Sequence, residues 1–328
     1  MLETILRELT SAYGPSGREE KIREVITSIA APFCESVKTD ALGNLIAFRP
    51  GKSGKRLMLT AHMDQIGLMV TDIQADGFLR VAAVGGLRPA MAIARRVVFE
   101  NNEMGTVFYE TKKKKPGEAE MENLFVDVGA KDKAEAGAIA RIGDIAVFYS
   151  PLNIKNGLAV GGALDNRLGC AVVLEALSAP SDHDIYAVFT VQEEVGTRGA
   201  GPAAYGILPT LSIVLDVTPA GDFPKAAQTS VSLGQGPALK IMDRSVVVSP
   251  QVRRILEEVA KAAGIEIQYE VLTAGGTDTG VIARTAGGVL SGCISLPCRY
   301  IHSPVETAAL SDAVQAVSWV KAIMEASL

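Results

Sequence analysis

Several common features are scarce in this sequence, and each absence narrows what the protein can be. Among 328 residues there are only three histidines, and the four cysteines follow no Cys-x-x-Cys spacing; this favours free thiols in a reducing compartment. No uncharged apolar run reaches about 18 residues, so no membrane-spanning helix is predicted. The first residues mix charged and apolar side chains, unlike a signal peptide. We therefore expect a cytoplasmic protein without a membrane partner.

The sequence also has no excess of positively charged residues. Lysine and arginine together number 32, against 37 for aspartate and glutamate, which gives a formal net charge of −5. Nucleic-acid-binding proteins normally carry a basic face, so no nucleic-acid partner is expected. The hydrophobic fraction is 48% and the charged fraction is 21%. Both are near the average of globular proteins and exclude a disordered chain. The length suggests about two domains.

What the sequence does contain is an alternation of helical and strand patterns. Apolar residues repeat with helical spacing, and short apolar runs separate these stretches. Ser16 and Glu19 have the spacing of a capping box, and Ser311 is placed to cap the last helix. We predict helices over 2–9, 22–29, 168–177, 252–259 and 313–320, and strands over 57–61, 184–192 and 212–215. This alternation predicts an α/β fold with a mostly parallel sheet flanked by helices.

The middle of the chain has a different pattern. Between about 68 and 154 the helical period fades, and turn residues separate short β-rich segments at 78–81, 96–99, 105–109, 124–128 and 144–148. Such a series predicts a small β-barrel or sandwich. We therefore expect a discontinuous α/β domain, residues 1–67 and 155–328, with an inserted β domain at 68–154. Within the insert, the run Lys112–Lys115 is either a solvated loop or a site for an anionic partner.

Polar residues that can carry chemistry lie where the predicted strands end. A histidine and an aspartate follow the first strand, two glutamates follow the second, and an aspartate follows the third. Sites in open α/β sheets form beyond the carboxyl ends of the strands, so these side chains should meet at one edge. With two further candidates at the ends of other apolar segments, the set is His62, Asp64, Asp165, Glu193, Glu194, Asp216 and His302.

The composition of this set fits a two-metal hydrolytic site. Zinc sites of hydrolases use histidine and carboxylate ligands and keep one position open for water. Two metals about 3.5–4 Å apart need a shared carboxylate and roughly two further ligands each. Two histidines and three or four carboxylates satisfy that count. They also leave one acid to move protons and one aspartate to orient a histidine.

Each of these residues also has an ordinary structural interpretation. His62 alone could be a core histidine, Asp165 a helix cap and Asp216 a turn cap. The two adjacent glutamates could be a solvated strand end, because neighbouring strand residues point to opposite faces. It is their joint placement that favours a site. The third histidine, His183, lies in a loop-like segment and is expected at the surface.

Seven motifs resemble the glutamyl or deblocking aminopeptidases, a family also called tetrahedral aminopeptidases, some of which carry a cellulase or endoglucanase label. The likeness spans the chain and is weakest in the middle insert. Gln65 and Asn166 stand where many members have acidic residues, and Pro219 and Phe223 also depart from the pattern, which bears on substrate preference. The motifs are 61–67, 163–169, 191–199, 215–217, 234–244, 275–280 and 298–306.

The resemblance implies a zinc-peptidase type of fold with two divalent metal ions, zinc or cobalt. By motif position, His62 and Asp216 would bind one metal, Glu194 and His302 the other, and Asp165 would bridge them. Glu193 would be the general base and acid, and Asp64 would hold the His62 ring. The family's inserted β domain forms dimers, which assemble into a dodecamer, so a homo-oligomer is expected.

The expected function is therefore metal-dependent hydrolysis of N-terminal residues from short peptides with a free N-terminus. Two alternatives remain open on the residues alone. One is a glycoside hydrolase that uses Glu193 with Asp64 or Glu194 and needs no metal. The other is a non-catalytic assembly or metal-binding protein on the same fold.

Overall fold

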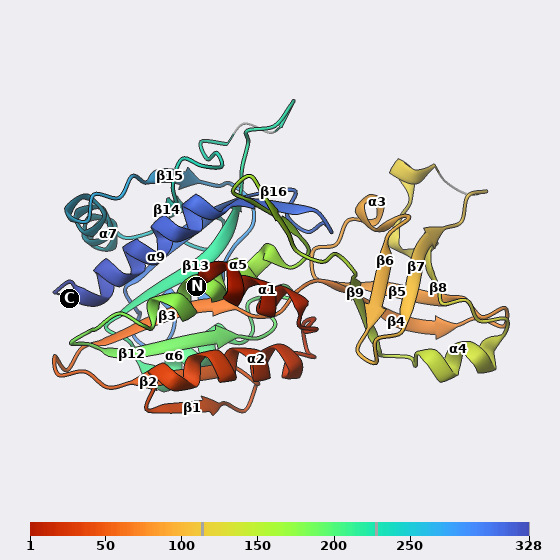
Figure 1. The fold of residues 1–328 in the computed structure, drawn as a ribbon, viewed down its shortest axis with the longest axis horizontal. Coiled ribbons are helices and arrows are strands. Elements are labelled where there is room, and N and C mark those ends of the chain that lie inside the picture. Colours follow the sequence, from red (N-terminus) through yellow and green to blue (C-terminus); the bar gives the residue numbers. More distant parts are fainter. Residues whose placement is uncertain (113–114, 227–228, 328) are drawn as a thin grey trace.

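The computed structural model describes residues 1–112, 115–226 and 229–327, and its largest element is one mixed sheet. The strands of this sheet are β1 (Ser36–Thr39), β2 (Leu45–Arg49), β3 (Arg56–His62), β10 (Asn153–Lys155), β11 (Leu158–Gly161), β12 (Asp184–Thr190), β13 (Leu211–Pro219), β14 (Ala238–Met242), β15 (Gln268–Val271), β16 (Ser291–Arg299) and β17 (Glu306–Ala309). They run in the order β1-β2-β12-β3-β13-β16-β17-β11-β10, and β14 and β15 extend from β16 (Figure 1).

The centre of this sheet is parallel, and the branch formed by β14 and β15 also pairs in parallel. β3 pairs in parallel with β12 and β13, and β13 pairs in parallel with β16. In contrast, β2, β17 and β11 pair antiparallel with their neighbours. The prediction of a mostly parallel sheet is thus correct for the centre and wrong for the flanks. The connection between β16 and β17 covers only residues 300–305, which can close an antiparallel pair but is too short for a parallel crossover.

Helices cover both faces of the main sheet. On one face lie α1 (Leu2–Ser11), α2 (Glu20–Ala30), α5 (Leu164–Ala176), α7 (Pro250–Ala262) and α9 (Leu310–Glu325), and on the other lie α6 (Ala200–Ile207) and α8 (Asp278–Ala283). Leu57 and Leu59 join the core beside α5, whereas Met58 joins the core beside α6. Burial on both faces explains why β3 is an unbroken apolar run. Trp319 of α9 is fully buried, and its indole N–H donates to the carbonyl oxygen of Leu256 at 3.2 Å.

The chain between β3 and β10 forms a closed six-stranded barrel with its own apolar core. Its strands, in the order β4-β5-β8-β7-β6-β9, are β4 (Gly67–Ile73), β5 (Leu79–Val84), β8 (Leu124–Asp127), β7 (Met104–Tyr109), β6 (Arg96–Phe99) and β9 (Ile145–Phe148). The expected barrel or sandwich is therefore a barrel. β4 is not among the predicted segments, because a bulge between Val70 and Asp72 breaks its two-residue alternation.

Short helices complete both parts of the molecule. The barrel carries α3 (Pro89–Ala92) and α4 (Lys133–Ile139), and 3-10 turns lie at Ala31–Phe33, Pro116–Glu118 and Met121–Asn123. Within the part of the chain that the structure describes, no helix is long and apolar enough to cross a membrane. In the Lys112–Lys115 run, Lys113 and Lys114 lie outside the described residues.

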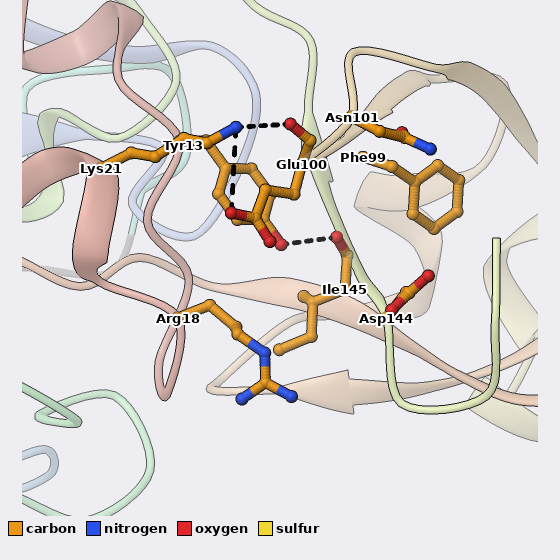
Figure 2. Close-up of a pocket in the computed structure, with 8 residues that line it drawn as sticks. All are labelled: Tyr13, Arg18, Lys21, Phe99, Glu100, Asn101, Asp144 and Ile145. Carbon is orange, nitrogen blue, oxygen red and sulfur yellow. Dashed lines mark hydrogen bonds and ion pairs between the residues drawn. The ribbon is translucent and has the colours of Figure 1, made fainter. Parts of the chain in front are cut away.

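Polar contacts join the barrel to α2 and to the segment that precedes it. The Tyr13 hydroxyl donates to the carbonyl oxygen of Ile145 at 2.8 Å, and the Lys21 ammonium donates to the carbonyl oxygen of Glu100 at 2.6 Å (Figure 2). These residues line a cavity of about 350 Å³ at the junction. None of the seven predicted site residues lines it, so the cavity is separate from the cluster described below.

Two predicted helix caps are absent. α2 begins at Glu20, and the Ser16 hydroxyl donates instead to the Asp64 carboxylate at 2.6 Å. Glu19 accepts from the backbone N–H of Gly17 at 2.7 Å. α9 begins at Leu310, so Ser311 lies inside its first turn. The sequence spacing identifies a hydroxyl group that could cap a helix. It does not show whether that hydroxyl has another hydrogen-bond partner in the folded protein.

His183 is buried, contrary to the prediction of a surface residue. Only 5% of it is exposed. Its Nδ1 lies 2.7 Å from the Ser53 hydroxyl, and its Nε2 lies 2.7 Å from the carbonyl oxygen of Ala326. Two segments distant in the sequence therefore cover this loop, and a local loop pattern does not reveal such cover.

Candidate active site

Five segments bring the predicted residues together at the carboxyl ends of the central strands. β3 ends in His62, and Asp64 lies two positions further along the chain. β12 ends at Thr190, shortly before the glutamate pair. The other segments are the start of α5, the middle of β13 and the connection between β16 and β17. The residues that they supply are Asp165, Asp216 and His302.

Asp216 lies inside its strand rather than at the end. β13 continues to Pro219, so the short apolar run in the sequence underestimates the strand. The carboxylate still reaches the cluster, because its Oδ1 lies 3.6 Å from Nε2 of His62. The prediction of a site residue here does not depend on the predicted strand end.

The residues form two overlapping groups, each of which could hold a metal ion. In the first group, Nε2 of His62 lies 3.1 Å from Oδ1 of Asp165, and Asp216 is close to both. In the second, Nε2 of His302 lies 3.1 Å from Oε2 of Glu194 and 3.4 Å from Oδ2 of Asp165. Asp165 thus offers one carboxylate oxygen to each group.

Asp64 holds the surrounding backbone. Its Oδ1 accepts the backbone N–H of Glu193 at 3.0 Å, and its Oδ2 accepts that of Glu194 at 3.2 Å. Its Oδ1 also lies 3.4 Å from Nδ1 of His62. The Asp64 carboxylate is fully buried, so it fixes β3 against the turn that follows β12.

The donor atoms fit divalent cations. Asp165, Glu194 and Asp216 lie close together with at most 9% of each side chain exposed, and buried like charges need compensation. Among the described residues, Oε1 of Glu194 has no hydrogen-bond partner although it is buried. Carboxylates with two imidazole nitrogens are the ligand types of hydrolytic zinc sites. The chemistry of the set therefore matches a cation centre.

The ionisation of the cluster shows the same need for positive charge. Burial alone would lower the pKa of His302, but the Asp165 and Glu194 carboxylates raise it to about 11. Burial would raise the pKa of Asp165, yet its bonds to His302 and His62 hold it well below its usual range.

Glu193 differs from the other clustered carboxylates in its place and in its ionisation. It follows Gln192 in the turn after β12 and is not a member of either metal group. Burial raises its pKa well above the usual range, and the charges of Asp216 and Asp278 raise it further. A carboxyl group whose pKa is raised above its usual range holds a proton more readily than an ordinary glutamate does.

Sequence reasoning missed two buried carboxylates near the cluster. Oε2 of Glu306 accepts the backbone N–H of Asp165 at 3.0 Å, and its Oε1 accepts that of His302 at 2.9 Å. Asp278 accepts the Thr190 hydroxyl at 2.6 Å, whereas its Oδ1 has no partner among the described residues. Both lie in motifs that carry the family resemblance, but neither follows a predicted strand.

Comparison with known sequences identifies the family of this chain. The sequence matches the M42 glutamyl aminopeptidase family over residues 43–318. A protein of Acetivibrio thermocellus named as a candidate aminopeptidase is 47% identical over 315 residues, or 95% of each chain. The lysyl aminopeptidase of Pyrococcus furiosus is 34% identical over 336 residues, which cover 98% of this chain and 96% of the relative.

Solved structures agree as well. An aminopeptidase of the archaeon Desulfurococcus kamchatkensis is 36% identical and superposes with a TM-score of 0.94, covering 99% of this chain and 94% of the other. The TET1 peptidase of Pyrococcus horikoshii, described as able to assemble into a tetrahedron or a large octahedral shell, is 31% identical with a TM-score of 0.89, covering 100% of both chains. The family match spans most of the sequence, and these relatives are matched along nearly their whole length. This chain therefore belongs to the M42 glutamyl aminopeptidase family and is a peptide hydrolase.

Proposed function

We propose that the protein removes N-terminal residues from short peptides by means of two divalent cations, zinc or cobalt. His62, Asp165 and Asp216 would hold one cation, and Asp165, Glu194 and His302 the other. The observation that carries this proposal is that the two oxygens of Asp165 face different groups. Such a shared carboxylate is the feature that a two-metal hydrolytic centre requires.

The residues of the chain divide the remaining tasks. Cations bound at the two groups supply Lewis acidity for an attacking water and for the scissile carbonyl. Glu193 takes the proton of that water and delivers it to the leaving amine. Asp64 positions His62 and the backbone of Glu193, so that base and ligands keep a fixed geometry.

The acidic surroundings favour a substrate with a free α-amine. The three carboxylates that belong to the two groups, together with Glu193, offer oxygens that can accept hydrogen bonds from an ammonium group. We therefore expect amino-blocked peptides to be cleaved far more slowly than free ones. Equal cleavage of acetylated and free forms of the same peptide would rule out this part of the proposal.

The similarity to a solved TET1 peptidase supports a homo-oligomer. Because a TET1 peptidase of the same fold is described as forming closed shells, we propose that this chain forms a homo-oligomer, with dimers assembling into a dodecamer. Its subunit would have an α/β catalytic domain at 1–67 and 155–328, of the zinc-peptidase type, and a dimer-forming barrel domain at 68–154. Light scattering of the purified protein measures the assembly directly.

Chelation tests the cation centre against a glycosidase. Protein stripped with EDTA should lose hydrolysis of aminoacyl-nitroanilides and regain it with Zn²⁺ or Co²⁺. A glycosidase with two carboxylates needs no metal, so activity that survives complete stripping would favour it. That alternative leaves the two clustered histidines unexplained, and the family match does not favour it.

Glu193→Gln tests whether the protein is an enzyme or only a metal-binding protein. We expect turnover to fall by about 10²–10⁴-fold, while the protein still binds both cations, because Glu193 is in neither group. Glu194→Gln is the matched control, since it should lower cation binding as well. The rates at which the unchanged protein hydrolyses a set of aminoacyl-nitroanilides, measured with each metal, identify the preferred N-terminal residue.

A further inference from the structure

The barrel reaches directly into the second cation group. The turn that follows β5 contains Gly85 and Gly86. The carbonyl oxygen of Gly86 lies 3.1 Å from Nδ1 of His302. No sequence pattern connects these residues, which are 216 positions apart.

This contact fixes the tautomer of the imidazole. A carbonyl oxygen can only accept a hydrogen bond, so Nδ1 of His302 must carry the proton that it shares with Gly86. In the neutral ring, the lone pair is then on Nε2. Nε2 is also the nitrogen that faces Glu194 and Asp165, at 3.1 and 3.4 Å.

His302 has more need of such support than His62. The His302 side chain is 31% exposed, whereas that of His62 is 3% exposed. The backbone of His302 has a φ of +61°, in the left-handed region, and Glu306 holds its N–H. The carbonyl oxygen of Gly86 contacts Nδ1 of His302, the ring nitrogen that does not face Glu194 and Asp165.

A side chain at position 86 would have to displace the imidazole of His302. A Cβ atom placed on Gly86 would lie 2.6 Å from Nδ1 and 2.7 Å from Cε1 of His302. Gly86 does not have a positive φ, unlike Gly85 at +81°. An alanine at 86 would therefore be tolerated by the backbone and would act through the imidazole.

We propose that the barrel turn at Gly85–Gly86 is a positioning element for the second cation group: it sets the orientation and the tautomer of His302. This inference rests on the proposed cation centre. It makes the barrel part of the construction of the active site, and Gly86 acts through His302 without contact with the substrate.

Calorimetric titration of Zn²⁺ into EDTA-stripped, full-length protein tests the proposal. We expect Gly86→Ala to weaken one Zn²⁺ per chain by about 10–100-fold, because the added Cβ would push the imidazole of His302 away from the carbonyl oxygen of residue 86, and loss of an outer contact of a ligand usually has an effect of this size. The other Zn²⁺ should bind within threefold of the unchanged protein. Gly117→Ala is the matched control, because Gly117 lies in the same insert and a Cβ atom there meets nothing within 4 Å.

A double substitution separates positioning from a general structural effect. In His302→Ala the imidazole is absent, so adding Gly86→Ala should change Zn²⁺ affinity no further, and the double variant should fold even if Gly86→Ala alone does not. A further loss in that background, or unchanged affinities in Gly86→Ala, would overturn the inference and leave the cation centre intact. If the unchanged protein bound no Zn²⁺, both proposals would fail.

Discussion

The Asp64 carboxylate accepts the backbone N–H of Glu193 at 3.0 Å, so the residue expected to orient a histidine also holds the proposed base. Its second oxygen serves Glu194 in the same way. Asp64→Asn replaces one of these accepting oxygens by an amide nitrogen, which donates and cannot accept. We expect kcat/KM to fall about 10–100-fold, with weaker Zn²⁺ binding.

Ser16→Ala is the control for that prediction. It removes the hydroxyl that also contacts Asp64, at 2.6 Å, but leaves the bonds to the glutamate backbone in place. Its loss of kcat/KM should be clearly smaller. If both variants lost the same activity, the backbone contacts of Asp64 would not be the important ones.

Glu306→Gln should weaken both the fold and cation binding. The carboxylate is 2% exposed and accepts the N–H groups of Asp165 and His302, and an amide nitrogen in place of one oxygen would face a donor. We expect a loss of about 1–3 kcal/mol in the free energy of unfolding and weaker binding of Zn²⁺. Urea unfolding and calorimetry measure the two effects. The exposed Glu325, substituted in the same way, should behave like the unchanged protein, and equal behaviour of the two variants would contradict the role of Glu306.

Asp278 predicts a pH dependence of stability. Burial raises its pKa to about 7, although the bond from Thr190 opposes this. Between about pH 4 and pH 7 the folded chain therefore keeps a proton that the unfolded chain releases, so the free energy of unfolding falls as pH rises through this window.

Asp278→Asn removes that titration while an amide oxygen can still accept from Thr190. In EDTA-treated protein, its free energy of unfolding should improve relative to the unchanged protein by on the order of 2 kcal/mol between pH 5 and pH 8. Urea unfolding at both pH values provides the comparison, with the exposed Asp76→Asn as control. A difference that does not vary with pH would contradict the assignment.

Tyr13→Phe should loosen the joint between the barrel and the main sheet. It deletes the hydroxyl that donates to Ile145 in the barrel, and one such bond contributes about 1 kcal/mol. Trp319, the single tryptophan, lies in the α/β part. Its fluorescence therefore reports the unfolding of that part, and it can be compared with circular dichroism, which reports the loss of secondary structure in the whole chain. Tyr205→Phe is the control at an exposed tyrosine. A result equal to this control would show that the joint does not depend on Tyr13.

The gathering of the candidate site residues is easier to predict from the sequence than the contacts around them. His62 and Asp64 are identifiable because a buried strand is an unbroken apolar run that ends at them. Asp216 is identifiable although β13 continues past it. The strand directions at the sheet flanks are not predictable from periodicity, because alternation is the same in parallel and antiparallel strands.

The contacts that hold the ligands are invisible in the sequence for another reason. Glu306 reaches Asp165 across 141 positions, and Gly86 reaches His302 across 216. The spacing of Ser16 predicts a local helix cap, yet its hydroxyl donates to Asp64, which is 48 positions away. Local spacing describes residues a few positions apart, whereas these partners meet only when the two parts of the fold are assembled.

The insertion of the barrel also sets the order in which the protein can be completed during synthesis. All barrel strands lie in one stretch of the sequence, between Gly67 and Phe148. In contrast, β3 pairs with β12 and β13, which come later in the chain. Chains emerge from the ribosome N-terminus first, so we expect the nascent barrel to close while β3 is still an unpaired apolar segment. His302 emerges near the end, and the cation centre can therefore form only after almost the whole chain has been made.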